Sequence, residues 1–170
     1  LDGSTGRQDL TVSYKYHEGT GQIAEASGKG TSFSSNGVPG NSSISDIIQT
    51  YAIVNGQAKI KTAATANTRV NNVDGSHSVN VAGVTRDSVV EYTYGTDRQG
   101  RQGVLINALN TQKGVTVMDD GHGTRTATET DQIYVVTDGQ ARLARSDTHS
   151  TSVGAASVQI DYAQGPSASA

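Results

Sequence analysis

The chain has 170 residues, enough for one domain or two small ones, but only 34% are hydrophobic, with no Trp and one Phe, which predicts a thin core. The net charge is −3 and the basic residues are spread along the chain, so no basic stripe exists to neutralise phosphates and nucleic acid is not an expected partner. Cysteine is absent and no apolar run reaches the roughly 20 residues of a membrane helix, which excludes a disulfide framework and a thiolate metal site and predicts no membrane span.

The first predicted element is a strand over residues 10–16, in which apolar and polar residues alternate. Side chains two residues apart point to the same side of a strand, so one face is apolar. That face carries Leu10, Val12, Tyr14 and Tyr16. The tyrosines at 14, 16, 92 and 94 are the largest side chains of an aromatic-poor protein and are expected in the core. The chain begins with Leu rather than Met, which suggests a removed leader and predicts a secreted or cell-surface protein.

Asn-Gly and Asp-Gly pairs mark the predicted turns. They suit type I′ hairpin turns, in which both central residues need positive φ. Three such pairs begin at positions 36, 55 and 74, a constant spacing of 19 residues, and two more begin at 120 and 138. That spacing holds two short strands with a turn at each end, so the pattern predicts an antiparallel meander.

The segment 43–52 is the one place where a helix competes with a strand. Its apolar residues fall at helical spacing behind possible serine caps: Ile44, Ile47, Ile48 and Tyr51. The corresponding segment of the second half, residues 126–134, has alternating threonines that suit a sheet and make a poor helix. A strand is therefore preferred over most of this segment, and a single helical turn remains open.

The two halves of the chain resemble each other. Residues 51–60 (YAIVNGQAKI) match residues 134–143 (YVVTDGQARL), and Val-x-Tyr-x-Tyr at 12–16 recurs at 90–94. The sequence thus predicts an all-β protein, an antiparallel hairpin-rich sandwich or barrel built from two diverged repeats of one β unit. We assign the first repeat to residues 9–88, the second to 89–163 and a C-terminal tail to 164–170.

A third echo of the opening strand lies at residues 158–162 (VQIDY) and has no hairpin after it. An unpaired edge strand is a template for pairing with another chain. The opening strand and this orphan strand are therefore the expected elements of subunit contact. The candidate contact residues are Leu10, Val12, Tyr14, Tyr16, Val158, Ile160 and Tyr162.

Residues with catalytic or metal-binding chemistry do not cluster. Asp119 and Asp120 beside His122 offer oxygen and nitrogen ligands for a cation, but a hairpin turn accounts for them better. Threonines at 124, 126, 128 and 130 predict a hydroxyl ladder, read as a solvated sheet face rather than an ice- or mineral-binding surface. No nucleophile motif or paired histidine is present, so no catalytic, cofactor or metal site is predicted and the chain is not expected to be an enzyme.

Duplication, absent chemistry and edge strands at both ends favour an extracellular structural protein that assembles with copies of itself into a fibre, sheath or pilus-like polymer. The alternative is an adhesin or carbohydrate-binding domain that contacts glycans or a cell surface through the long loop 95–103, where Arg98 and Arg101 stand out. A small outer-membrane barrel matches the length, but seven Tyr and one Phe hardly supply its aromatic girdles.

Overall fold

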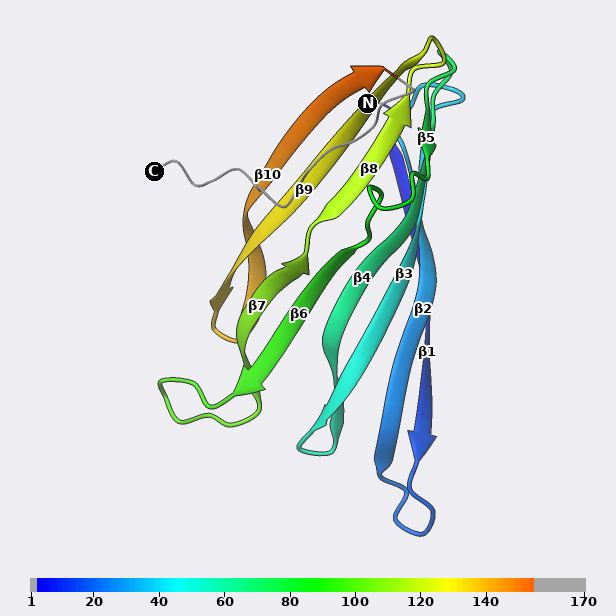
Figure 1. The fold of residues 1–170 in the computed structure, drawn as a ribbon. Helices are drawn as coiled ribbons and strands as arrows, with labels where there is room; N and C mark the ends of the chain where they lie inside the picture. Colours follow the sequence, from blue (N-terminus) through cyan, green and yellow to red (C-terminus); the bar gives the residue numbers. More distant parts are fainter. Residues whose placement is uncertain (1–2, 155–170) are drawn as a thin grey trace.

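The computed structural model describes residues 3–154, and in that part the chain is all β, without a helix (Figure 1). Ten strands follow one another along the chain. They are β1 Thr5–Tyr16, β2 Ile23–Ser35, β3 Ser42–Val54, β4 Gln57–Asn71, β5 His77–Val79, β6 Ser88–Gly95, β7 Val104–Gln112, β8 Gly114–Asp119, β9 Thr124–Thr137 and β10 Gln140–Gly154. The predicted all-β antiparallel class is confirmed.

All ten strands belong to one antiparallel sheet, whose main path runs β1-β2-β3-β4-β5-β8-β9-β10. The strands β6 and β7 lie off this path, because β6 pairs with β4 and β7 pairs with β6. Beyond β4 the sheet therefore forks. Its upper branch is β5 and β8 and its lower branch is β6 and β7. Figure 1 shows the β4–β5 turn (residues 72–76) and the β8–β9 turn (residues 120–123), which we call the upper turns, at the top of the sheet.

The sheet is open, with β1 at one edge and β10 at the other, so the prediction of a sandwich or barrel is not confirmed for the described residues. Pairing continues across the predicted boundary between the two repeats, where Ala64 of β4 lies opposite Val89 of β6. The division into residues 9–88 and 89–163 stays a prediction.

The β3–β4 and β9–β10 hairpins match in detail. Both turns have positive φ at both central residues: 52° and 76° at Asn55 and Gly56, and 52° and 73° at Asp138 and Gly139. Each hairpin shifts register by one residue just after the pair formed by its tyrosine, Tyr51↔Ile60 in one and Tyr134↔Leu143 in the other. Each tyrosine also donates its hydroxyl to the glutamine two residues before it, Gln49 at 2.8 Å and Gln132 at 2.9 Å. These equivalent hairpins confirm what the internal match predicts for this segment.

The segment 43–52 is strand throughout, inside β3. Its isoleucines are divided between the two faces of the sheet, because Ile47 pairs with Thr65 and its neighbour Ile48 with Ala64. The helical spacing of apolar residues is thus a coincidence of a strand that is partly buried on both sides.

Register and alternation place the six described tyrosines on one face, which we call the tyrosine face. Residues that pair across neighbouring strands lie on the same face of the sheet. Val12 pairs with Gly28, and Gly28 pairs with Gln49. Gln49 in turn pairs with Ala63, which pairs with Val90. The tyrosine face carries Tyr14, Tyr16, Tyr51, Tyr92, Tyr94 and Tyr134.

The core changes face along the sheet. In the upper branch the buried side chains of Val115, Val117 and Ala127 point away from the tyrosine face and are covered by Val84 of the β5–β6 connection. In the lower branch Val90 and Ala108 are buried on the tyrosine face itself. The predicted thin core is thus divided between two small regions.

Candidate functional site

Among the described residues, the two edge strands of the sheet leave long rows of backbone groups without a ladder partner. The β1 strand has 12 residues and pairs only with β2, and the 15-residue β10 pairs only with β9. The outer edge of each strand therefore has backbone N–H and C=O groups with no ladder partner within residues 3–154. Such an edge is a template for a further strand.

The two edges run in opposite directions. Every pairing in the sheet is antiparallel and the main path has an even number of strands, eight, so β1 and β10 point to opposite ends. When one copy is set beside the next in the same orientation, β10 of the first lies antiparallel to β1 of the second. The tyrosine face then continues from copy to copy.

Exposed apolar side chains accompany both edges. On β1, Tyr14 and Tyr16 are 47% and 58% exposed, and their rings are 6.5 Å apart. On β10, Leu143 is 52% exposed and shares the tyrosine face because it pairs with Tyr134. Tyr14 and Tyr16 are near the end of β1 and Leu143 is near the start of β10, and Figure 1 shows both of these strand ends at the lower end of the sheet.

The sequence-predicted contact residues divide into two groups. Leu10, Tyr14 and Tyr16 are exposed and Val12 is half-buried, on one face of the β1 edge. The expectation that Tyr14 and Tyr16 belong to the core is therefore wrong, because β1 is an edge strand that nothing among the described residues covers. Tyr92 and Tyr94 are partly buried, and burial raises the pKa of both phenols. The remaining candidates, Val158, Ile160 and Tyr162, lie outside the described residues.

Charges at the edges are neutralised locally. On β1, Arg7 pairs with Asp9 at 2.8 Å, and on β10 Arg145 pairs with Asp147 at 2.8 Å. Lys15 contacts Glu25 of β2 at 2.8 Å, and this hydrogen bond raises the pKa of the lysine. Edge charges usually discourage strand addition. Each of these charges has an opposite charge beside it, which reduces that protection.

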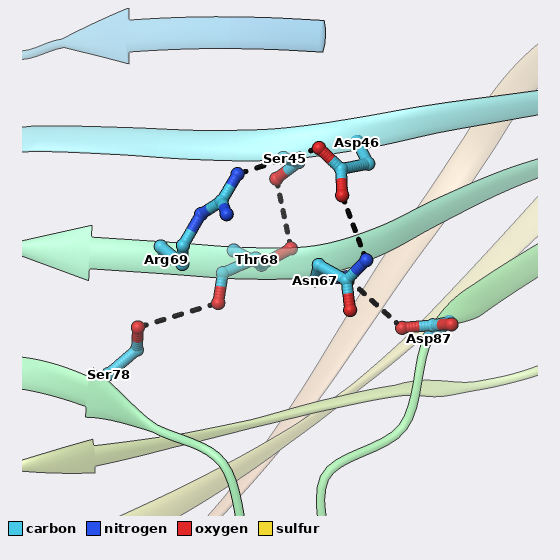
Figure 2. Close-up of polar contacts among 7 residues, drawn as sticks. All are labelled: Ser45, Asp46, Asn67, Thr68, Arg69, Ser78 and Asp87. Atoms are coloured by element: carbon cyan, nitrogen blue, oxygen red, sulfur yellow. Dashed lines mark hydrogen bonds and ion pairs between the residues drawn. The ribbon is translucent and has the colours of Figure 1, made fainter. Parts of the chain in front are cut away.

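The fork creates a second polar site, on β4 (Figure 2). Residues 66–70 have no strand partner on the fork side, because β4 pairs with β6 through Thr65 and with β5 only from Asn71 onward. Side chains replace the missing strand. Asp87 accepts from the backbone N–H of Asn67 at 3.2 Å, and Ser78 accepts from that of Val70 at 2.8 Å.

A bulge on the other side of β4 fixes the same segment. Asn67 has a left-handed φ of 49°, which a non-glycine residue rarely adopts. Its side-chain amide donates to Asp46 at 2.8 Å, a carboxylate that also contacts Arg69 at 3.5 Å (Figure 2). Beside them, Ser45 is buried and its hydroxyl lies 2.9 Å from that of Thr68. The sequence carries no periodic signal for this bulge, so sequence reasoning missed it.

A hollow of about 620 Å³ opens at the fork, lined mostly by hydroxyl, amide and guanidinium groups. Behind it Arg86 binds Glu129 at 3.0 Å, and Lys113 approaches the same carboxylate at 3.8 Å. Glu129 is only 4% exposed, and a nearly buried carboxylate without a cation beside it would be costly to the fold. This ion group joins the β5–β6 connection to β9 and to the residue between β7 and β8.

The upper turns use their carboxylates internally. Asp120 accepts from the backbone N–H groups of Thr124 and His122, and Asp119 accepts from Gly121 and pairs with Arg125 at 3.0 Å. These hydrogen bonds lower the pKa of both carboxyls. No cluster of three or more metal-ligating side chains occurs among residues 3–154. The preferred interpretation of this segment as a turn between strands agrees with the structure.

The threonine ladder of β9 forms part of an exposed polar surface. Thr126 and Thr128 lie on the tyrosine face, in its upper half, and their hydroxyls are each 2.9 Å from a serine hydroxyl of β10, Ser152 and Ser150. The hydroxyls therefore bond to one another across the strands rather than forming an unpaired array. A solvated sheet face describes this arrangement.

No protein-family model matches the sequence, and no curated protein and no solved structure matches the chain either. Within residues 3–154 no helix has the length and apolar character that a membrane crossing requires.

Proposed function

We propose that this chain is an extracellular or cell-surface structural protein that assembles with copies of itself into a fibre, sheath or pilus-like polymer. The observation that carries the proposal is the pair of long, open edges of opposite direction in one sheet. In the polymer, β10 of one subunit pairs antiparallel with β1 of the next, and the sheet continues through the contact.

Backbone pairing supplies much of the expected affinity. Each edge group that gains a ladder hydrogen bond contributes about 1 kcal/mol net of the water it loses. Contact of Tyr14 and Tyr16 with Leu143 adds aromatic–aliphatic pairs across strands, each worth up to about 1 kcal/mol. Several such terms are needed, because association also costs translational and rotational freedom.

The contact would be heterologous, since it joins two different edges. Heterologous contacts leave one free edge at each end of a growing chain and so give open polymers unless the rotation between subunits closes a ring. Assembly would then need no ligand and would depend on protein concentration.

A two-variant mixing experiment tests this proposal. In Tyr14→Lys/Tyr16→Lys the β1 edge is blocked, and in Leu143→Lys the β10 edge is blocked, because lysines disfavour strand addition at an edge. We expect filaments from the unaltered chain by electron microscopy, and monomers from each variant alone by sedimentation. An equimolar mixture should give a 1:1 dimer, because one free β1 edge and one free β10 edge remain.

The matched control is Leu109→Lys, which replaces a side chain that is 57% exposed on the opposite face of β7, away from both edges. We expect this variant to assemble normally. Filaments from both edge variants would contradict edge pairing. An alternative form of the polymer uses the strand predicted at 158–162 as the exchanged element. Deleting residues 157–170 distinguishes the two forms. The truncated protein should still form filaments if β1 pairs with β10, and should form none if residues 158–162 are exchanged.

A further inference from the structure

The β6–β7 loop, residues 96–103, is longer than its hairpin requires. The hairpins β3–β4 and β9–β10 turn in two residues, at 55–56 and 138–139, as most tight hairpins do. Longer ordered loops that stay fixed are frequently binding elements. Figure 1 shows this loop projecting at the lower end, beside the β9–β10 turn.

One carboxylate organises the loop. Asp97 accepts from the backbone N–H groups of Gln99 at 3.0 Å and Arg101 at 2.8 Å, and pairs with the Arg101 guanidinium at 2.5 Å. Burial opposes ionisation of Asp97, but its hydrogen bonds with Arg101 outweigh this effect and lower the pKa of the carboxyl. Arg101 thus helps to fix the shape of the loop through its backbone N–H and its Nε.

The other end of the loop is fixed to β4. The ammonium group of Lys59 donates to the carbonyl of Gly103 at 2.5 Å and lies 5.4 Å from the centroid of the Tyr94 ring. Gly103 has a φ of 71°, and a Cβ there would stand 2.5 Å from the side-chain amide of Asn55. The positive φ favours glycine at this position, and the short distance to Asn55 shows that the loop and the β3–β4 turn pack closely.

Arg98 is left over. Among residues 3–154 its guanidinium has no hydrogen-bond or ion-pair partner, although it is held on a loop that Asp97 and Lys59 fix in place. It lines an open hollow of about 510 Å³ between the loop and the β9–β10 turn. The lining of the hollow includes apolar side chains, Leu105, Ile106 and Val136, and polar ones, Thr96, Thr137 and Asp138.

We propose that this hollow binds an acidic sugar residue, a ring that carries a carboxylate. The Arg98 guanidinium matches a carboxylate in a bidentate pair. The carboxylate of Asp138 accepts hydrogen bonds from sugar hydroxyls, and Ile106, which is 43% exposed, offers an apolar surface to ring C–H groups. This binding function is independent of the edges and would attach the assembled protein to acidic glycans.

Saturation-transfer NMR with free sugars tests the proposal on assembled or monomeric protein alike. Galacturonic acid and N-acetylneuraminic acid are the two carboxylate sources, and galacturonic acid methyl ester is the neutral probe. We expect saturation transfer to at least one acid, and binding of that acid about ten-fold or more tighter than of the ester, because a charge-assisted bond is lost in the ester. Equal binding of acid and ester, or no transfer to either acid, would overturn the proposal.

Arg98→Gln should weaken binding of the acid by about ten-fold while its circular dichroism spectrum and filament formation stay unchanged. The matched control is Arg142→Gln, an exposed arginine of β10 that does not line the hollow, and it should bind like the unaltered chain. Unchanged affinity in Arg98→Gln would also overturn the proposal. Because the edge variants leave the loop intact, failure of sugar binding and failure of assembly are separate results.

Discussion

The upper and lower parts of the sheet bury opposite faces. In the upper part Val115, Val117 and Ala127 are covered on the face opposite the tyrosines, and the hydroxyl-rich side of the same strands is left in water. In the lower part the tyrosine face is the more buried one, around Val90 and Ala108. One sheet can do this because a strand presents both faces, and what covers each face is decided by the connections.

The fork separates the two arrangements. The β5–β6 connection crosses to the back of β8 and β9 and brings Val84 and Arg86 against them. Below it, β6 returns to β4 and supplies Tyr92 and Tyr94 to the opposite side. The upper part therefore depends on a small aliphatic core and a buried ion group, whereas the lower part depends on tyrosine packing and hairpin geometry.

Removing the upper ion group should have the largest effect. Arg86→Met leaves the nearly buried Glu129 with only the more distant Lys113, and we expect a loss of about 3 kcal/mol in the free energy of unfolding. Urea unfolding measures it. The exposed pair on β10 is the control, and Arg145→Met should change stability by less than about 1 kcal/mol. Similar losses in both variants would contradict the special role of the upper ion group.

A glycine substitution tests how β1 is attached. A Cβ at Gly30 would stand 2.0 Å from the carbonyl oxygen of Asp9 and 2.8 Å from the Cα of Leu10, both in the β1 backbone. Gly30→Ala should displace β1 at a cost of about 2 kcal/mol, with faster amide exchange across β1. In Gly28→Ala the new methyl meets only the side chains of Gln49 and Tyr51, at 3.2 Å or more, and should cost less. Equal exchange of β1 in both variants would refute this.

The equivalence of the two hairpins predicts equal energetic effects. Tyr51→Phe and Tyr134→Phe each remove one hydroxyl that donates to a glutamine on the same strand. Each should lower the free energy of unfolding by about 1 kcal/mol, and the double variant by the sum, because the two sites are distant. A difference well beyond measurement error between the two single variants would mean that the hairpins differ in their surroundings.

Acid should destabilise the fold through the upper turns, and this effect on stability should be the smallest of those predicted. The folded-state pKa values of Asp119 and Asp120 are lowered by turn hydrogen bonds, so the ionised forms stabilise the fold above the unfolded pKa of about 4. That contribution disappears as pH falls through the lower folded-state values. The melting temperature of the unaltered chain should therefore decrease below about pH 4 more steeply than that of Asp119→Asn/Asp120→Asn. Parallel curves would exclude this contribution.

Local chemistry alone determined the strand class and the tight turns. Asn55-Gly56 and Asp138-Gly139 accept positive φ at both positions, which fixes a tight turn. The alternation in residues 10–16 dictates a strand with one apolar face. Both the turn and the strand are therefore determined by residues that are close together in the sequence. The match of residues 51–60 with 134–143 likewise reports a shared hairpin, because the same short-range contacts recur in each.

Only the tertiary structure decided which strands are edges, where the sheet forks and which face is buried. Nothing near Tyr14 in the sequence states that β1 has a single neighbour, and the same Val-x-Tyr-x-Tyr pattern is exposed in β1 and partly buried in β6. The contacts of Asn67 with Asp46 and Asp87 span 21 and 20 residues. Such long-range contacts depend on the path of the whole chain, which short-range periodicity does not encode.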